Sequence, residues 1–365
     1  MKKKAAKMHL AVLTSAAKDK FFGGNHQTFS ELIYAGRKNN IDVSVLIPNA
    51  LDAEKLTGYL LKSLVGEKKV WVKEELPWPD VVYNRIPNRK AEQATDVKHF
   101  KQILRKKRIP FFNTNFFYKD KLLELLNKEQ RLQTTLPETV RWGDKAKFYQ
   151  LLLKHDMIYL KPVDWSIGKG IFKLTKRSEG WVIEQQQLNS QCELQGYFEP
   201  SELIETLKKL LPKRAYLVQQ GIELLETSVK RKCDMRTLVQ KNKTGNWGVT
   251  GIGVRIAGLR AIATHRVYGG SLGDVDTVLQ DKFKLAKAMD IKRELAKKSL
   301  EVAKVLDQHD QGHLGEISID WGVDQTGRLW FFEANAKPMR FDEPHIQNKA
   351  THNVLDYALF LSKHK

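Results

Sequence analysis

The sequence contains little cysteine, with only Cys192 and Cys233 among 365 residues. These two residues form no CxxC pair, and two cysteines are too few for a disulfide framework. A thiolate zinc site and a small secreted scaffold held by disulfides are therefore both disfavoured. We expect the protein to work in a reducing compartment such as the cytoplasm.

The sequence also lacks a long apolar run. A membrane-spanning helix needs about 20 mostly apolar residues, and no segment comes close. The start, MKKKAAKMHLAVLTSAAKD, has the basic end of a signal peptide, but its apolar stretch is short and is interrupted by His9, Thr14 and Ser15. We interpret "HLAVLT" as a first β-strand and expect no membrane span.

Positive charge is in clear excess, because 62 Lys and Arg against 42 Asp and Glu give a net charge of +20. Such a charge attracts polyanions, including nucleotides, nucleic acid and acidic polymers. The basic residues are spread along the chain in short clusters such as "RKKR" at 105–108. This spread favours a solvated basic surface, so no specific nucleic-acid partner is expected.

Strand and helix signals alternate over residues 1–115. "HLAVLT", a Gly-Gly loop, the amphipathic "TFSELIYAGRKNN" and "IDVSVLIP" form a βαβ unit, which predicts a parallel sheet. The Gly-Gly loop lacks GxGxxG, so a tight turn is favoured over a phosphate site. Residues 116–220 and 221–365 mix strands and helices, including one long helix from about residue 276 to 307. The fold class predicted is an α/β domain followed by α+β units.

The stretch "EISIDWGVDQTGRLWFFEAN" predicts a β-hairpin with a polar end, because "DQTG" is a turn signal between two strands. With Val323 opposite Trp330, Asp320 falls opposite Glu333. Asn335 shares their face, since strand side chains alternate. Two carboxylates and an amide oxygen form a hard-oxygen set suited to Mg²⁺ or Mn²⁺. On spacing alone, an ordinary charged strand end is the simpler interpretation.

A glycine-containing loop between two further strands could approach phosphates. In "YLKPVDWSIGKGIFKL", Lys161 ends the first strand, and the loop holds Ser166, Gly168, Lys169 and Gly170. Glycine lets backbone NH groups come close to a phosphate. The Walker A pattern GxxxxGK[ST] is absent, and the loop alone is better explained as a hairpin with a solvated lysine.

The strand "YLVQQGIEL" breaks at Gly221, where the backbone could meet an adenine edge and Glu223 a ribose hydroxyl. This hinge consists of Gln219, Gln220, Gly221, Ile222 and Glu223. Three cations also lie near apolar elements: Lys121 at a helix start, Arg236 in "DMRTLV" and Arg255 in "GIGVRIA". Each cation taken singly is more typical of a surface or an ion pair than of catalysis.

In chain order, these features resemble the ATP-grasp superfamily, whose nucleotide lies between two α+β subdomains. The interval from Asp320 to Glu333, and "EAN" followed by "KP", resemble the D-alanine-D-alanine ligase and glutathione synthetase branches. Over nearly the whole chain, motifs such as "FGGNHQTFSELIYAG", "PDVVYNRIPNR", "CDMRTLVQKNKTGNWGVTGIGVRIA" and "GEISIDWGVDQTGRLWFFEANAKPMR" resemble the YheC/YheD endospore coat-associated proteins. The resemblance implies a pre-ATP-grasp-like parallel α/β domain (1–115), a central lid subdomain (116–220) and a C-terminal subdomain with the metal site (221–365).

The resemblance also implies roles for individual residues. The implied ATP contacts are Lys121, Lys161, Ser166, Gly168, Lys169, Gly170 and the hinge residues Gln219, Gln220, Gly221, Ile222 and Glu223. Mg²⁺, or Mn²⁺, would be held by Asp320, Glu333 and Asn335. Arg255 and Lys161 would be the catalytic residues. Arg255 would stabilise the transferred phosphoryl group, whereas Lys121 and Lys161 would neutralise phosphate oxygens, and the Lys169 loop would close over the nucleotide and exclude water.

The superfamily machinery usually activates a carboxylate as an acyl phosphate, which an amine attacks to give an amide. The leading hypothesis is therefore an ATP- and Mg²⁺-dependent carboxylate-amine ligase for small-molecule or peptide substrates, with acidic ones fitting the basic surface. A coat-associated nucleotide-binding protein without ligase activity and nucleic-acid binding through net charge are the alternatives. Substrate-side candidates are Arg236, Arg340, Gly269 and Gly270. The implied location is the cytoplasm, in the mother cell with association to the spore coat.

Overall fold

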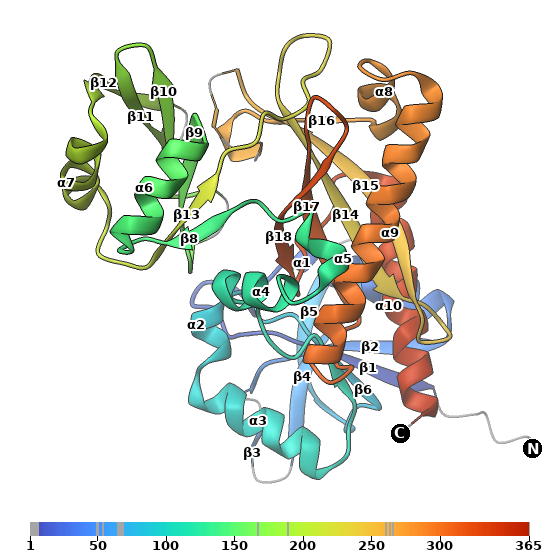
Figure 1. Cartoon of the computed structure of the whole chain (residues 1–365). Coiled ribbons are helices and arrows are strands. Elements are labelled where there is room, and N and C mark those ends of the chain that lie inside the picture. Colours follow the sequence, from blue (N-terminus) through green and yellow to red (C-terminus); the bar gives the residue numbers. More distant parts are fainter. Residues whose placement is uncertain are drawn as a thin grey trace, which may run out of the picture.

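The computed structural model describes residues 7–48, 51–52, 55–63, 69–165, 168–187, 190–259, 261–262, 264 and 266–364. Three β-sheets organise this part of the chain, and helices cover their faces (Figure 1). Within the described ranges, no helix combines the length and the apolar character needed to cross a membrane. Ser166 and His265 lie outside the described residues.

The first sheet is a mixed sheet built from the N-terminal part of the chain. Its strands are β1 (Met8–Leu13), β2 (Ile41–Leu46), β3 (Leu51–Asp52), β4 (Lys55–Ser63), β5 (Lys69–Leu76), β6 (Val81–Asn84) and β7 (Phe111–Phe112). Strands β2, β1, β6 and β7 are parallel neighbours, as the βαβ pattern predicted. Strands β3, β4 and β5 add an antiparallel extension that the pattern did not predict. The helices are α1 (His26–Lys38), α2 (Arg89–Glu92) and α3 (Thr95–Lys106).

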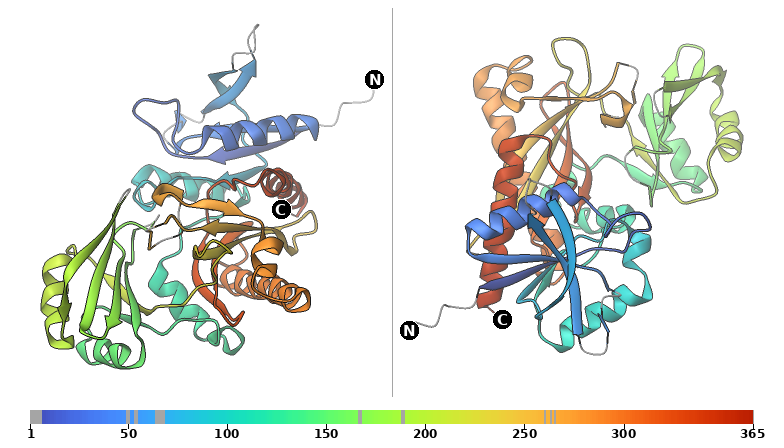
Figure 2. Two further views of the ribbon diagram at one scale, coloured as in Figure 1. Left: turned by 90° about the horizontal axis from the view of Figure 1, so that it is seen from above. Right: turned by 180° about the vertical axis from the view of Figure 1, so that it is seen from behind.

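The second sheet is antiparallel and has a core of its own. Its strands are β8 (Thr139–Arg141), β9 (Met157–Pro162), β10 (Phe172–Arg177), β11 (Gly180–Gln187), β12 (Ser190–Phe198) and β13 (Tyr216–Gln220), with helices α6 (Lys145–Lys154) and α7 (Pro200–Leu210). Phe148, Leu160, Phe172 and Leu203 are fully buried in this core. The unit stands to one side of the other two sheets in both views (Figures 1 and 2). We call it the lid.

The third sheet has the order β16-β15-β14-β17-β18 and is also antiparallel. The strands are β14 (Cys233–Lys241), β15 (Trp247–Ile256), β16 (Ser271–Gly273), β17 (Glu316–Val323) and β18 (Leu329–Asn335). The associated helices are α4 (Lys119–Leu126), α5 (Gln130–Gln133), η2 (Arg266–Tyr268), α8 (Val275–Gln280), α9 (Leu285–His309) and α10 (Pro344–Lys363). One face packs Trp321, Phe331 and Ile319 into a core with α9.

Two features differ from the expected organisation. The long helix predicted near 276–307 is two helices, because Phe283 turns inward to pack on the core and Lys284 takes an extended conformation before α9 begins. Leu122 and Leu132, which fall in the segment expected with the lid, pack into the core of the third sheet instead. The unit that stands apart therefore starts near Thr139.

The C-terminal helix α10 packs against the N-terminal sheet as well as the third sheet. Val354, Leu355 and Tyr357 are buried in the core of the first sheet, and Ile346 packs with Leu238 of the third sheet. Figure 2 shows this helix running beside the first sheet. The first and third sheets are therefore fixed to one another through α10.

Candidate functional site

The face of the third sheet opposite its core carries polar side chains in cross-strand rows. Arg236 of β14 pairs in register with Asp320 of β17, which pairs with Glu333 of β18. In the next row, Arg255 of β15 pairs with Asp234 of β14. The register therefore places two arginines and three carboxylates on one face, because residues two apart along a strand share a face.

A β-bulge gives Glu333 its orientation. Asp320 lies opposite Glu333, as predicted, but Val323 pairs with Leu329 and not with the predicted Trp330, because the register shifts by one residue after Asp320. The extra residue is Phe332. Strict alternation from the buried Phe331 would turn Glu333 into the core, and the bulge returns it to the polar face.

Asp320 is mostly buried and poorly satisfied. Its Oδ1 atom accepts no hydrogen bond from any described residue, and Arg236 Nε, which also lacks a hydrogen bond, lies 3.8 Å away. Burial raises the pKa of Asp320, and the arginine opposes this rise. A buried carboxylate oxygen without a hydrogen bond is uncommon, and a cation beside it would stabilise its charge. Asp320, Glu333 and Asn335 supply only hard oxygen donors, which fit Mg²⁺ or Mn²⁺.

Among the described residues, no group of three or more His, Cys, Asp or Glu side chains is arranged to hold a metal ion. The predicted set is different in kind, because it contains two carboxylates and one amide. Asn335 pairs in register with Ser318 and lies two residues beyond Glu333 on the same face. A metal ion held by Asp320, Glu333 and Asn335 would need further oxygen ligands, which these three residues do not supply.

Glu333 has an ion-pair partner that the sequence did not indicate. Lys119 Nζ lies 3.2 Å from Glu333 Oε2 and donates to the carbonyl oxygen of Trp165 at 3.1 Å. Lys119 thus joins the lid loop to the third sheet. Lys121, the lysine chosen from the sequence, is 70% exposed and pairs with Glu124 on its own helix at 3.4 Å. The structure does not bring Lys121 to the carboxylates.

Lys161 reaches the same region from the lid. Its Nζ donates to Gln219 Oε1 at 2.6 Å and lies 5.1 Å from the ring centroid of Phe332. Burial lowers the pKa of Lys161 to about 8, and the nearby Lys119 lowers it further while Glu333 opposes the shift. The lysine is therefore a half-buried cation held between the lid and the third sheet, where phosphate would stabilise its charged form.

The chain leaves the lid sheet directly after Gln220, the last residue of β13. Gly221 donates its backbone NH to the Met157 carbonyl oxygen at 2.8 Å, and a Cβ at this glycine would lie 2.7 Å from that oxygen. Gln220 ends β13, Ile222 is buried and Glu223 is exposed. The glycine is therefore required for close approach of two lid strands, besides any role at a nucleotide.

The glycine loop of the lid is shaped by its aromatic neighbour. Gly168 and Gly170 both have φ of +68°, and a Cβ at Gly170 would lie 2.4 Å from the ring of Trp165. Lys169 Nζ lies 5.2 Å from the ring centroid of Trp165. Since the Trp165 carbonyl also binds Lys119, the loop is tied to the Glu333 ion pair.

Asp234 is a site residue that sequence reasoning missed. Its Oδ2 accepts a hydrogen bond from Thr264, whereas its Oδ1 is buried and accepts none from the described residues. Burial, reinforced by Asp320, raises the pKa of Asp234 to about 7. The available signal was its position in "CDMRTLV", two residues before Arg236 and hence on the same strand face.

The two arginines of this face have different surroundings. Arg236 is buried, donates to Ser318 Oγ and to the Met339 carbonyl oxygen, each at 3.3 Å, and stacks 4.6 Å from the Phe341 ring centroid. Burial lowers the pKa of Arg236 to about 10, so it stays cationic near neutral pH. Arg255 is half-buried beside Asp234. Both can face an anionic substrate.

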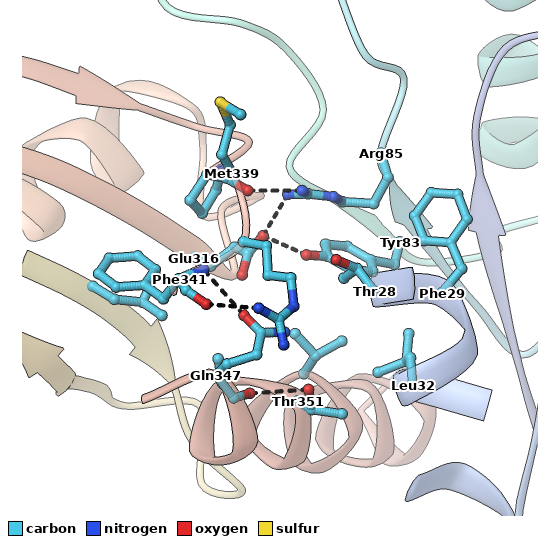
Figure 3. A pocket seen from close by; sticks show the side chains of 15 residues that line it. Thr28, Phe29, Leu32, Tyr83, Arg85, Glu316, Met339, Phe341, Gln347 and Thr351 are labelled. Atoms are coloured by element: carbon cyan, nitrogen blue, oxygen red, sulfur yellow. Dashed lines mark hydrogen bonds and ion pairs between the residues drawn. The ribbon is translucent and has the colours of Figure 1, made fainter. Parts of the chain in front are cut away.

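The other substrate-side candidates are dispersed. Gly269, with φ of +78°, and Gly270 lie between η2 and β16, whose Leu272 pairs in register with Arg255. Arg340 instead pairs with Glu31 of α1 at 2.9 Å. It lines a small pocket of about 40 Å³ between the first and third sheets (Figure 3).

The protein has the features of an ATP-grasp protein. These are three sheets, a lid that carries Lys161, and the residues Asp320, Glu333 and Asn335 on the sheet that faces the lid. Residues 108–361 match the family of YheC/D-like ATP-grasp proteins. The endospore coat-associated protein YheD of Bacillus subtilis (strain 168) is 31% identical over 309 residues, which cover 83% of this chain and 67% of that protein. The chain therefore belongs to the YheC/D-like ATP-grasp family.

Solved structures share the fold at low sequence identity. The VanG D-Ala:D-Ser ligase of Enterococcus faecalis has a TM-score of 0.54 and 12% identity, covering 98% of this chain and 99% of its own. The ATP-grasp ligase PsnB, complexed with a minimal precursor, has a TM-score of 0.53 and 13% identity, covering 96% and 98%. The fold confirms the predicted ATP-grasp class, which in general terms implies ATP and a divalent metal.

Proposed function

We propose that the protein is an ATP- and Mg²⁺-dependent carboxylate-amine ligase that acts through an acyl phosphate. The observation that carries the proposal is the row Arg236, Asp320 and Glu333 on the third sheet, facing Lys161 of the lid. The buried Oδ1 of Asp320, which accepts no hydrogen bond from the described residues and has only a long contact of 3.8 Å with Arg236 Nε, supports a cation here. Asp320, Glu333 and Asn335 would hold Mg²⁺, which would offset phosphate charge when bound.

The chain's own cations have separate tasks in this proposal. Lys161 of the lid and Lys119 of α4 neutralise phosphate oxygens, with Lys119 taking the place expected for Lys121. Arg255 and Arg236 orient the carboxylate substrate and stabilise negative charge on the transferred group. The Lys169 loop covers the nucleotide and excludes water, which would otherwise hydrolyse an acyl phosphate.

The reaction balances as two displacements. A carboxylate oxygen attacks the γ-phosphorus, the bond to the β-phosphate bridging oxygen breaks, and ADP leaves. The amine nitrogen then attacks the acyl carbon, the carbon-oxygen bond to phosphate breaks, and an amide, inorganic phosphate and a proton result. VanG is named as a ligase of amino acids and PsnB as a ligase complexed with a precursor, so amino acids and peptides are the acceptors to screen first.

A purified-protein assay tests this function. The protein is incubated with ATP and Mg²⁺ and with a panel of amino acids and acidic peptides, and ADP release is measured in the presence and absence of hydroxylamine. We expect a substrate-dependent burst of ADP and a hydroxamate product, because hydroxylamine traps acyl phosphates. ATP affinity without ADP release on any carboxylate, or in an extract of sporulating cells, would contradict the ligase.

A binding role is the second candidate, and the name of the relative YheD supports it. In that case the +20 chain would dock to acidic material of a spore coat in the mother cell, and ATP would regulate docking. Co-sedimentation with isolated coats, with and without Mg·ATP, separates this role from ligation. Nucleotide-independent, salt-sensitive retention on DNA would instead favour nucleic-acid binding.

A further inference from the structure

Lys337 lies two residues beyond Asn335, where β18 leaves the third sheet. Its side chain is 3% exposed, and its Nζ donates a hydrogen bond to Glu92 Oε1 of the first unit, whose side chain is also 3% exposed. The ammonium group lies 4.4 Å from the ring centroid of Phe116. This ion pair therefore connects the metal-ligand strand to a different sheet, and it is fully enclosed.

Glu92 is an anchored carboxylate. It accepts hydrogen bonds from Asn84 Nδ2 at 2.8 Å, Lys101 Nζ at 3.2 Å and the Phe116 backbone NH at 3.1 Å, besides the one from Lys337. A carboxylate fixed by several donors cannot follow a moving partner without losing them. Lys337 is therefore held at a defined position relative to the first sheet.

The residues on each side of Lys337 are held by the same sheet. Asn113, fully buried with φ of +57°, donates its side-chain amide to the Ala336 carbonyl oxygen, and also to the Glu316 carbonyl oxygen at 2.8 Å. Arg85 donates to the Pro338 carbonyl oxygen at 2.7 Å. Figure 3 shows Arg85 beside Glu316 and Met339 at the interface of the two units.

From these contacts we propose that the Glu92–Lys337 pair positions Asn335 for metal binding, and that the first sheet thereby sets the metal affinity of the third. The inference rests on the proposed function, which makes Asn335 a metal ligand. Asn335 is the last residue of β18, so its backbone is held by the pairing with Ser318 on one side and by the contacts of Ala336, Lys337 and Pro338 on the other. Residues that orient metal ligands typically change metal affinity by about 10- to 100-fold when removed.

Mn²⁺ binding tests the inference without reference to turnover. Free Mn²⁺ is measured by electron paramagnetic resonance with wild-type protein saturated with a non-hydrolysable ATP analogue, then with Lys337→Met, Glu92→Gln and the double variant. We expect each variant to bind Mn²⁺ about tenfold more weakly, while affinity for the metal-free analogue changes less than twofold. The double variant should not regain Mn²⁺ affinity. It should stay less stable than wild type, because Lys101, which also pairs with Glu92 Oε1 at 3.2 Å, remains buried without its carboxylate.

The matched control is Asp307→Asn. Asp307 Oδ2 pairs with Lys241 Nζ at 2.8 Å, with side chains 14% and 8% exposed, but this pair joins β14 to α9 away from the exit of β18. The Asp307→Asn variant should be less stable than wild type and should keep wild-type Mn²⁺ affinity. Wild-type Mn²⁺ affinity in Lys337→Met or in the double variant would overturn the positioning role. No Mn²⁺ binding by the wild type would overturn the proposed function and the inference with it.

Discussion

Burial shifts the pKa values of single residues of the polar face away from their ordinary values in water. Asp234 and Asp320 are carboxylates whose pKa values burial raises, and Lys161 is a lysine whose pKa burial lowers to about 8. Each shift costs folding stability at pH values where the group must carry its charge. A metal ion and a polyphosphate together would relieve these costs, because they supply the opposite charges.

Lys161 should make ATP binding to the polar face depend on pH. Folding lowers its pKa, so the charged form, which phosphate needs, is present below about pH 8 and is lost as the pH rises through that value. Metal-free ATP affinity should therefore fall between pH 7 and 9. Calorimetric titration across this range measures it, and Lys161→Arg should flatten the profile because arginine stays charged. An unchanged wild-type affinity would show that Lys161 does not meet phosphate.

Lys119 and Lys121 are two positions apart, but replacing each by methionine should affect ATP affinity differently. Lys119→Met removes the cation between Glu333 and the lid and should weaken ATP binding about tenfold, since charged hydrogen bonds contribute about 1.5–3 kcal/mol. Lys121→Met removes only an exposed pair with Glu124 and should stay within about twofold. The opposite order in calorimetric titrations would restore Lys121 as the phosphate lysine.

At the scale of elements, the bulge in β18 decides which side chains lie on the polar face of the third sheet. Phe332 is the extra residue, and its ring lies over Gly322, where an added Cβ would come within 2.5 Å of it. Removing Phe332 would leave Glu333 directly after Phe331 and restore strict alternation with Glu333 still on the polar face. Removing Ala334 would instead turn Asn335 toward the core.

The two deletions therefore make a matched pair. Deletion of Phe332 should give a folded protein that keeps Mn²⁺ affinity within a few-fold, whereas deletion of Ala334 should lose both stability and Mn²⁺ binding. Circular dichroism melting and Mn²⁺ titration measure the two outcomes. Equal damage from both deletions would mean that the bulge itself is needed.

Substitution of the hinge glycine, Gly221, tests how closely the chain approaches strand β9. Gly221→Ala places a Cβ against the backbone of Met157, which cannot move away without breaking the β9 to β13 pairing, so we expect a loss of about 1–3 kcal/mol of unfolding free energy. Gly248→Ala in β15 meets nothing within 4 Å and should be near neutral. Urea unfolding of both variants compares them, and equal midpoints would contradict the close approach.

Sequence patterns predicted the parallel part of the first sheet, because it follows from local periodicity. They also placed Asp320 opposite Glu333, but from a register that is one residue off at the turn, and the bulge at Phe332 compensates for that offset. They did not predict the antiparallel extension β3 to β5. They also missed the bulge, because an apolar run such as "LWFF" gives no sign of which residue is unpaired. The choice between Lys119 and Lys121 depends on helix rotation against the lid, which the motif "YKDK" does not encode.

At the scale of the whole molecule, the lid has a separate core while the first and third sheets share α10. The lid meets the third sheet through few contacts, including Lys161 over Phe332 and Lys119 at the Trp165 carbonyl. A unit with its own core and a small polar contact can move as a body. We therefore expect the lid to close on the nucleotide while the other two sheets stay fixed.

Hydrogen exchange measures this closure. Mg·ATP should slow exchange in the lid strands β9 and β10 and in the start of α4, and should leave β1, β2 and β6 unchanged within error. Protection spread evenly over all three sheets would indicate general stabilisation and not closure. No protection in the lid would contradict binding between the lid and the third sheet.

The central claim is that Glu333 and Asp320 form a metal-nucleotide site, and Glu333→Gln tests it most directly. The change keeps the shape of the side chain and removes the charge that a cation needs. We predict that Mg·ATP titrated into Glu333→Gln binds at least about tenfold more weakly than to wild type, and that ATP turnover is abolished. Wild-type affinity and wild-type turnover in this variant would contradict the account.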